Sequence, residues 1–289
     1  MKTRSHVYWA AFILFYGVPA EAREARQDIV DSVALYAAIT GKQLPPLDDD
    51  DWDDLRKGKP AVGFFKESLK EDEVTAMGVI GMHVVESPRL LVWLTVMGGT
   101  RERDERLTRT YLSRTDDGSY LRYQHINVPW PFRDRHWVIE CEKNLEVATH
   151  SAGRIWEHHW KLTDDGTSQL EKAAELTGLN QRTMDKSIYI ASNAGAWILF
   201  ELEAERTLVV FWSDVDLGGG IPRSLVRRFA RGQIRDRLED LGPMSRRVAH
   251  VYYGKPVIHD GFGTPVSATA TLRVAQEDHA AERSVLRTE

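Results

Sequence analysis

One stretch of the chain reads Asn127-Val128-Pro129-Trp130-Pro131-Phe132-Arg133-Asp134-Arg135-His136-Trp137-Val138. Proline fixes φ and lacks the N–H that a strand ladder needs, so we expect a strand to begin after Pro131. Successive side chains of a strand point to opposite faces of a sheet. One face of the predicted strand therefore groups Arg135, Trp137, Ile139 and Cys141.

A second stretch, residues 216–229, reads Asp-Leu-Gly-Gly-Gly-Ile-Pro-Arg-Ser-Leu-Val-Arg-Arg-Phe. Proline is favoured in the first turn of a helix, so Ile221-Pro222 is expected to open a long helix that runs to about Leu241. Gly242-Pro243 should then kink or break this helix. Ile221, Leu225 and Phe229 recur every four residues and predict one apolar stripe along it.

In order and spacing, these stretches resemble the START family of lipid-transfer domains. The resemblance adds a Gly-x-Trp strand at residues 195–197 and a Thr-x-Val strand at residues 207–209, and it covers roughly residues 50–250. One departure is His136, which stands where the family usually has aspartate. The resemblance implies an α+β helix-grip fold, in which a curved antiparallel β-sheet wraps around a long C-terminal α-helix and encloses a hydrophobic cavity. It also implies a lipid ligand.

A second departure concerns sterols. Sterol-type members of the family resemble one another in a buried arginine six residues after the first arginine of the strand, paired with an acid one strand earlier. Here the first position holds Cys141, and Arg122 lies near the second. The same buried ion pair cannot form, so we do not expect a sterol.

The composition is that of a globular protein with one large domain or two small ones. The chain has 289 residues, of which 42% are hydrophobic and 28% charged, and no internal repeat argues for two domains. A formal net charge of −5 argues against a general nucleic-acid binder, which needs a broad basic face. The single cysteine excludes an internal disulfide, and we expect a monomer.

The N-terminal residues have the pattern of an export signal. Lys2 and Arg4 precede an apolar core at residues 7–18, and Ala20-Glu21-Ala22 supplies small residues for cleavage after Ala22. A membrane anchor needs about 20 apolar residues, which this run lacks, and a buried N-terminal helix leaves the positive flank unexplained. We therefore expect a periplasmic or secreted protein. The predicted domains are residues 1–22 (signal peptide), 23–47 (N-terminal helix and linker), 48–252 (START-like lipid-binding domain) and 253–289 (loosely held tail).

The acidic run from Asp48 to Asp54 has two interpretations. It could be a calcium site, but it lacks the glycine turn and the distal glutamate of an EF-hand loop. An acidic helix N-terminus, stabilised by the helix dipole, is the preferred interpretation.

Between residues 60 and 217 the pattern predicts an antiparallel meander with a short helix at residues 87–98. Residues 180–194 read as an irregular connection or a short helix. The expected strands are 61–67, 74–84, 106–114, 119–128, 136–147, 153–162, 168–177, 195–203 and 206–217.

Alternation within the predicted strands also selects the residues that could line a cavity. In strand 153–162, Trp156, His158 and Trp160 share the face that we expect to be buried, with Ile155 and Glu157 opposite. Core packing explains any one of these aromatic residues equally well, and Arg135 or Arg122 could hold a polar head group. The predicted ligand-binding residues are Arg122, Tyr123, Arg135, Trp137, Ile139, Cys141, Trp156, His158, Trp160, Trp197, Leu199, Phe211, Ile221, Leu225 and Phe229.

A basic stripe accompanies the apolar one on the predicted long helix. It consists of arginines spaced four residues apart, which could dock transiently on an anionic membrane surface. The alternative is a solvated face balanced by Asp236, Glu239 and Asp240. The stripe comprises Arg223, Arg227, Arg231 and Arg235.

No familiar catalytic or cofactor motif occurs in the sequence, so we expect neither a cofactor nor a metal. His158 and His159 are neighbours on a strand and point to opposite faces, so they cannot easily share one metal ion. We therefore predict a non-catalytic lipid-binding or lipid-transfer protein. Two alternatives stay open: a cyclase- or hydrolase-like helix-grip enzyme that uses His125, His158 or Glu201, and a periplasmic interaction module with a vestigial pocket.

Overall fold

A computed structural model describes residues 20–70, 73–98, 106–252 and 257–267, together with residues 269, 271, 273 and 274. The predicted signal peptide lies outside the described residues except for its last three, where the first helix begins. Within the described part of the chain, no helix combines the length and the apolar character needed to cross a bilayer.

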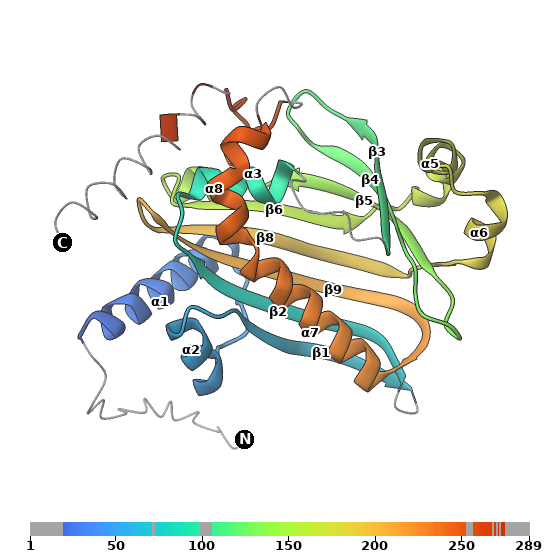
Figure 1. Cartoon of the computed structure of the whole chain (residues 1–289), viewed down its shortest axis with the longest axis horizontal. Coiled ribbons are helices and arrows are strands. Elements are labelled where there is room, and N and C mark those ends of the chain that lie inside the picture. Colours follow the sequence, from blue (N-terminus) through green and yellow to red (C-terminus); the bar gives the residue numbers. More distant parts are fainter. Residues whose placement is uncertain are drawn as a thin grey trace, which may run out of the picture.

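Nine strands form one sheet in the order β1-β2-β9-β8-β6-β5-β4-β3, with β7 added beside β5 (Figure 1). All pairs are antiparallel except β5–β7, which is parallel and two residues long. The strands are β1 (Ala61–Lys70), β2 (Glu73–Val85), β3 (Leu107–Arg114), β4 (Tyr120–Ile126), β5 (Arg135–Lys143), β6 (Ile155–Leu162), β7 (Ile188–Tyr189), β8 (Ser192–Glu203) and β9 (Arg206–Pro222).

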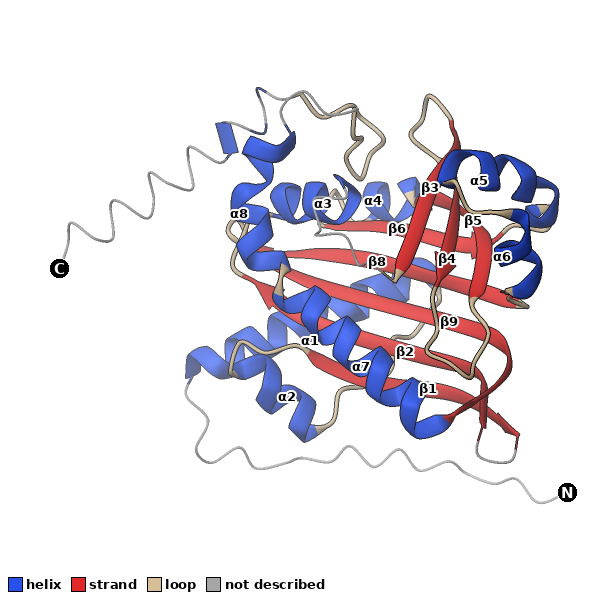
Figure 2. Cartoon of the chain, turned by 45° about the vertical axis from the view of Figure 1, so that its right-hand side comes forward, coloured by secondary structure: helices blue, strands red, loops and turns tan. Residues whose placement is uncertain are grey.

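Helices cover both faces of this sheet. In Figure 2, α7 crosses in front of the strands and α1 passes behind them. We call the face under α7 the inner face and the face under α1 the outer face. The helices are α1 (Ala20–Thr40), α2 (Asp49–Arg56), α3 (Arg89–Gly98), α4 (Leu145–His150), α5 (Leu170–Thr177), α6 (Gln181–Lys186), α7 (Arg223–Glu239) and α8 (Leu241–Tyr252).

The inner face carries the largest apolar core, which includes five tryptophans of the sheet and of α3. On α7, Ile234 and Leu238 are buried in this core, and Leu241 of α8 joins them. Gly81 of β2 permits the close approach, because a Cβ on it would lie 2.6 Å from Ile234 and 2.7 Å from Leu238. A curved antiparallel sheet gripped around a long C-terminal helix is the expected helix-grip α+β fold, which is confirmed.

The outer face carries a second core under α1 and α4, which the sequence did not predict. Tyr36 of α1 is fully buried and donates from its hydroxyl to Glu157 Oε1 at 3.0 Å. Asn144 Nδ2 donates to the other oxygen of the same carboxylate at 2.6 Å. The expectation that β6 buries only the face of Trp156, His158 and Trp160 is therefore wrong, because Ile155 and Glu157 are buried as well.

The segment expected to be a strand at residues 168–177 is instead a short 3-10 turn followed by α5. Ala173 is fully buried, and Leu170 and Ala174 pack with it against Leu112, Tyr123 and Val138. Three residues at helical spacing thus cover the outer face of β3 to β5. A short apolar run of this kind fits the periodicity of a helix and that of a strand equally well. Here Gly178 at φ +71° ends the helix.

The last hairpin is longer than predicted, and α7 begins later. Ile221 and Pro222 still belong to β9, and Pro222 takes the N-cap position at φ −51° and ψ 130°. Val226, Ile234 and Leu238 are the buried residues of α7, whereas Leu225 is 37% exposed. The expected break is present but lies at Asp240, because α7 ends at Glu239 and α8 begins at Leu241. Gly242 and Pro243 therefore lie in the first turn of α8.

The acidic run from Asp48 to Asp54 begins a helix, in agreement with the preferred interpretation of the sequence. Asp51 N donates to Asp48 Oδ1 at 2.8 Å, and Asp48 N donates to Asp51 Oδ2 at 3.3 Å, which is a reciprocal capping box. Within the residues that the structure describes, no group of three metal-binding side chains is close enough to hold an ion.

Part of the predicted loose tail is folded onto the inner core. Trp93 Nε1 donates to the carbonyl of His259 at 2.8 Å, and Val266 N donates to the carbonyl of Ile258 at 2.8 Å. Gly261 lies against the Trp156 ring, where a Cβ would be 2.1 Å from Cγ. We call residues 257–266 the C-terminal strap.

A methyl group at Gly261 tests whether the C-terminal strap is packed in solution. We expect Gly261→Ala to lower the free energy of unfolding by about 1–3 kcal/mol, because the ring or the strap must move. Gly232→Ala is the matched control: Gly232 lies in α7 with nothing within 4 Å of its Cβ position, so we expect stabilisation by up to about 1 kcal/mol. Equal effects of both variants in urea denaturation would contradict the packed strap.

Candidate functional site

A cavity of about 170 Å³ lies between the inner face of the sheet and α7. Aromatic rings of four strands form one part of its wall: Trp137 comes from β5, Trp160 from β6, Trp197 from β8 and Phe211 from β9. Polar side chains form another part, and they include Arg109, Arg122 and Arg237. The pairing of β8 with β9 places Trp197 directly opposite Phe211, and their ring centroids are 4.8 Å apart. We call this space the inner cavity.

Gly195 explains how the Trp160 ring fits into this wall. A Cβ on Gly195 would lie 2.3 Å from the Trp160 ring and 2.5 Å from the carbonyl oxygen of Trp212. Glycine in the Gly-x-Trp strand therefore leaves the space that the ring occupies. Trp160 Nε1 donates to Asn193 Oδ1 at 2.9 Å, which satisfies the buried N–H and fixes the ring.

His158 is the buried histidine of the inner cavity. Its ring stacks on Tyr120 with a centroid distance of 5.6 Å and an interplanar angle of 25°. Neither ring nitrogen has a hydrogen-bond partner among the described residues. Burial, followed by the nearby Arg122 guanidinium, lowers the pKa of His158 to about 3. The imidazole is therefore neutral at pH 7.

Arg122 lies beside this histidine on β4 and also borders the inner cavity. Its guanidinium is 5.8 Å from the centroid of the Tyr120 ring. Its Nε is buried and has no hydrogen-bond partner in the part of the chain that the structure describes. A cation with an unused buried donor is suited to a polar or anionic group of a ligand.

Six of the fifteen predicted ligand-binding residues border the inner cavity. Four others, Ile139, Cys141, Trp156 and Leu199, are buried in the surrounding inner core. Trp156 packs there against Trp93, with ring centroids 5.5 Å apart, and under the Arg89 guanidinium. The six that border the cavity are Arg122, Trp137, His158, Trp160, Trp197 and Phe211.

The Arg135 guanidinium donates its hydrogen bonds to backbone carbonyls, so it is not available to a ligand. Its Nε donates to the carbonyl of Leu217 at 3.1 Å, and its Nη2 donates to the carbonyls of Gly218 and Gly219 at 2.8 and 3.1 Å. Nη1 donates to the carbonyl of Arg133. The prediction that Arg135 could hold a ligand is therefore wrong, because it ties β5 to the end of β9.

Tyr123 was also assigned wrongly. It follows Arg122 on the same strand, so the two side chains point to opposite faces. Tyr123 is fully buried under α5 on the outer face, where its hydroxyl lies 3.2 Å from His136 Nδ1. Because side chains alternate along a strand, Arg122 and Tyr123 could not both line the inner cavity.

The predicted stripe Ile221, Leu225 and Phe229 does not cover the inner cavity. Ile221 lies in β9 and packs with Met77 and Val226, and Phe229 lies under the Arg106 guanidinium at 4.7 Å. The predicted stripe is wrong because Ile221 lies outside the helix and because the inward face of α7 carries Val226, Ile234 and Leu238. Gln233 and Arg237 of α7 border the cavity instead.

Other polar residues of the wall were missed although alternation could have found them. Tyr120, Arg122 and Gln124 occupy alternate positions of β4, and all three border the inner cavity. Gln124 Oε1 accepts from Trp137 Nε1 at 3.1 Å. Asn193 precedes the Gly-x-Trp motif and has no sequence signal of its own.

The basic stripe of α7 faces acidic groups of its own chain. Arg227, Arg231 and Arg235 line a groove of about 420 Å³ whose opposite wall is acidic α2. Arg235 pairs with Asp54 at 3.2 Å, and the guanidiniums of Arg227 and Arg231 lie 4.9 and 5.6 Å from the Phe64 ring centroid. Three of the four predicted membrane-docking arginines therefore have intramolecular neighbours, and Arg223 is exposed at the start of the helix.

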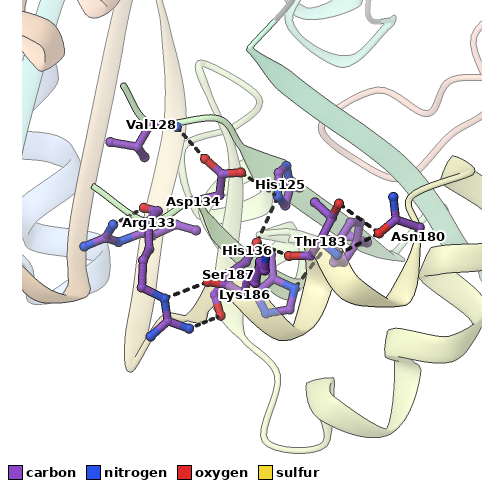
Figure 3. A network of polar contacts seen from close by, with 11 residues as sticks. His125, Val128, Arg133, Asp134, His136, Asn180, Thr183, Lys186 and Ser187 are labelled. Atoms are coloured by element: carbon purple, nitrogen blue, oxygen red, sulfur yellow. Dashed lines mark hydrogen bonds and ion pairs between the residues drawn. The ribbon is translucent and has the colours of Figure 1, made fainter. Parts of the chain in front are cut away.

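A polar cluster on the outer face superficially resembles a catalytic triad (Figure 3). His125 Nε2 lies 3.1 Å from Ser187 Oγ and 3.7 Å from Asp134 Oδ2. Ser187 Oγ donates to the carbonyl of Thr183 at 2.8 Å, so it accepts from the histidine. In a triad the serine gives its proton to one ring nitrogen and the acid holds the other. Both partners here share one nitrogen, so the cluster is structural.

The cluster fastens α6 and β7 to the sheet. Figure 3 shows Arg133 reaching the carbonyls of Lys186 and Ser187, at 2.6 and 3.1 Å. Of the three catalytic candidates, His125 therefore lies on the outer face, and Glu201 pairs with Arg89 at 2.7 Å, 42% exposed. His158 is the candidate that borders the inner cavity.

No family model matches the sequence, and no curated protein matches it. Among solved structures, human STARD10 is similar with a TM-score of 0.49 at 11% identity, over 76% of this chain and 90% of that chain. Human StAR-related lipid transfer protein 5 is similar with a TM-score of 0.46 at 14% identity, over 78% of this chain and 97% of that chain. The Zhui aromatase/cyclase from Streptomyces sp. R1128 has a TM-score of 0.39 at 17% identity, over 60% of this chain and 96% of that chain.

These values establish neither ligand nor activity for this chain. The fold rests on its own strand order and on the placement of α7 and α8. Its strand order and its long C-terminal helix are those of the helix-grip fold that the resemblance found in the sequence implies.

Buried histidines predict the pH dependence of stability. Burial, and after it the neighbouring His125, lowers the pKa of His136 to about 4. Histidines of an unfolded chain titrate near about pH 6.5. Between about pH 4 and pH 6.5 the unfolded state therefore binds more protons than the folded state. The free energy of unfolding is highest above about pH 6.5 and falls as the pH drops towards 4.

We expect His136→Gln to reduce the fall in melting temperature between pH 7 and pH 5. His150→Gln, at an exposed position of α4, is the control and should leave the profile unchanged. Thermal melting followed by circular dichroism gives both profiles. Parallel profiles for the wild type and His136→Gln would contradict the neutral buried imidazole.

Proposed function

We propose that the protein binds one hydrophobic ligand in the inner cavity and carries it without covalent chemistry. The observation that supports this most directly is the wall of three tryptophans and a phenylalanine between the sheet and α7, with Arg122 and His158 at its polar side. Burial of apolar ligand surface contributes about 25 cal/mol per Å². Ligand-binding sites typically combine hydrophobic and aromatic walls with polar groups that orient the ligand.

Arg122 is the residue that we propose for the polar end of the ligand. Arg135 is occupied by four backbone carbonyls, whereas the buried Nε of Arg122 has no partner among the described residues. A carboxylate or another acceptor could receive a charge-assisted hydrogen bond there. A lipid that carries its polar groups at one end of an apolar body fits this arrangement.

An enzyme on the same fold is the second candidate, because His158 carries two unpartnered ring nitrogens at the cavity. A general base works best when its pKa lies near the working pH. The pKa of His158 is lowered to about 3, and burial raises the pKa of the neighbouring Tyr120, so neither group is poised for proton transfer near pH 7. These shifts favour a carrier.

Export to the periplasm or the medium remains a prediction that rests on residues 1–22. Transient contact with an anionic membrane remains a prediction that rests on the arginines of α7. The exposed Arg223, at the helix start, is the member of that set best placed for it. The predicted monomer likewise awaits measurement.

A cavity-filling substitution tests the proposed function. Ser213 of β9 borders the inner cavity, so we expect Ser213→Phe to weaken binding of the neutral fluorescent probe N-phenyl-1-naphthylamine by at least about tenfold, through lost space. Ser192→Phe, at an exposed position of the paired strand β8, should bind the probe as the wild type does. Melting curves of both variants establish that they fold.

Two results would contradict the proposal. Equal binding by the wild type and folded Ser213→Phe would show that the probe lies elsewhere. No binding by the wild type, together with a stable protein complex in a pull-down, would favour the interaction-module alternative.

A further inference from the structure

A second chamber of about 390 Å³ adjoins the inner cavity. The two spaces share Met97, Tyr120 and His158 in their walls. The outer wall of the chamber is formed by Val257, Ile258 and His259, at the start of the C-terminal strap. No pattern in the sequence indicates this chamber, because its wall joins the segment around Tyr111 to the distant residues Val257 to His259.

The C-terminal strap is held in this position by contacts with the inner core. Trp93 Nε1 donates to the carbonyl of His259, and Ile258 packs with Leu91 and Leu94 of α3. On the opposite side, a Cβ on Gly118 would lie 2.5 Å from His259 Nδ1, so the β3–β4 turn and the strap are in close contact. The chamber is therefore a built part of the fold.

Two cationic side chains border the chamber. They are Lys143 and Arg114, and Asp116 is the acidic side chain in the same wall. Lys143 Nζ donates to the carbonyl of Asp117, which leaves further ammonium protons for another acceptor. The Arg114 guanidinium lies 4.0 Å from the centroid of the Tyr111 ring, in the same wall.

The wall shared by the two spaces also lies near cationic side chains. His158 stands in this wall, and the charges of Arg122 and Lys143 both act to lower its pKa, after burial as the main cause. Burial lowers the pKa of Lys143, and the carboxylates of Asp117 and Asp260 act in the opposite direction. An anionic group of a ligand beside Lys143 would add to their effect.

The volumes indicate that a ligand uses both spaces. Pockets for drug-sized ligands usually span about 300–1,000 Å³. The inner cavity alone holds about 170 Å³, whereas the adjoining chamber provides about 390 Å³ more. A ligand whose apolar body fills the inner cavity would extend past His158 into the chamber.

We propose that the second chamber is the subsite for an anionic group, so that the ligand is an anionic amphiphile whose charged end meets Lys143 and Arg114 and whose apolar body lies among Trp160, Trp197 and Phe211. The inference rests on the proposed function of the inner cavity. It adds the chemical class of the ligand and the direction in which the ligand lies.

Two probes that share one aromatic body separate this inference from the proposed function. N-phenyl-1-naphthylamine is neutral, and 8-anilinonaphthalene-1-sulfonate adds one sulfonate to the same rings. We expect Lys143→Met and Arg114→Met each to weaken sulfonate binding by about tenfold, and to change binding of the neutral probe by less than about twofold. Unchanged binding of the neutral probe also reports that the variants fold.

Lys161→Met is the matched control, because Lys161 lies on neighbouring β6 with 66% of its side chain exposed and pairs with Glu140. It should bind both probes as the wild type does. If Lys143→Met and Arg114→Met leave sulfonate binding unchanged, or weaken both probes equally, the anionic subsite is wrong and the inner cavity can still stand. If neither probe binds the wild type, the proposed function fails and the inference falls with it.

Discussion

A buried guanidinium at the start of β5 sets the geometry on which the rest of the site depends. Arg135 is 2% exposed and donates to the backbone carbonyls of Arg133, Leu217, Gly218 and Gly219. A buried charge is costly unless its donors are satisfied, so this set of contacts resists separation. Gly218 and Gly219 have φ of +60° and +61°, which turns their carbonyls towards the arginine. The end of β9, and with it the start of α7, is thereby fixed against β5.

The inner cavity follows from how α7 then crosses the sheet. Ile234 and Leu238 pack closely over Gly81, whereas further along the inner face the sheet contributes large aromatic rings. The indole N–H groups of Trp137 and Trp160 are bonded to Gln124 and Asn193, so the rings are fixed by side chains of the same wall. Gly195 leaves room for the Trp160 ring against β8.

Much of the fold could be predicted because its signals are local. The prolines before β5 and the directions of the side chains along β5 and β6 each follow from one stretch of chain, and a break after α7 lies close to the predicted Gly242-Pro243. The errors have a common cause, which is that they depend on contacts between distant segments. The helical phase of α7 depends on where β9 ends, the role of Arg135 on carbonyls some 80 residues away, and the burial of Glu157 on Tyr36. The second chamber needs the C-terminal strap, whose packing against Trp93 and Trp156 has no local pattern.

Native mass spectrometry of the protein purified from its own host, followed by organic extraction of whatever it releases, tests the central claim most directly. A cavity that carries one hydrophobic ligand should give a mass shift of one small molecule per chain, and the extract should contain a compound with an apolar body. A protein that retains no ligand, and that also takes up none from a panel of lipids and fatty acids, would contradict the account.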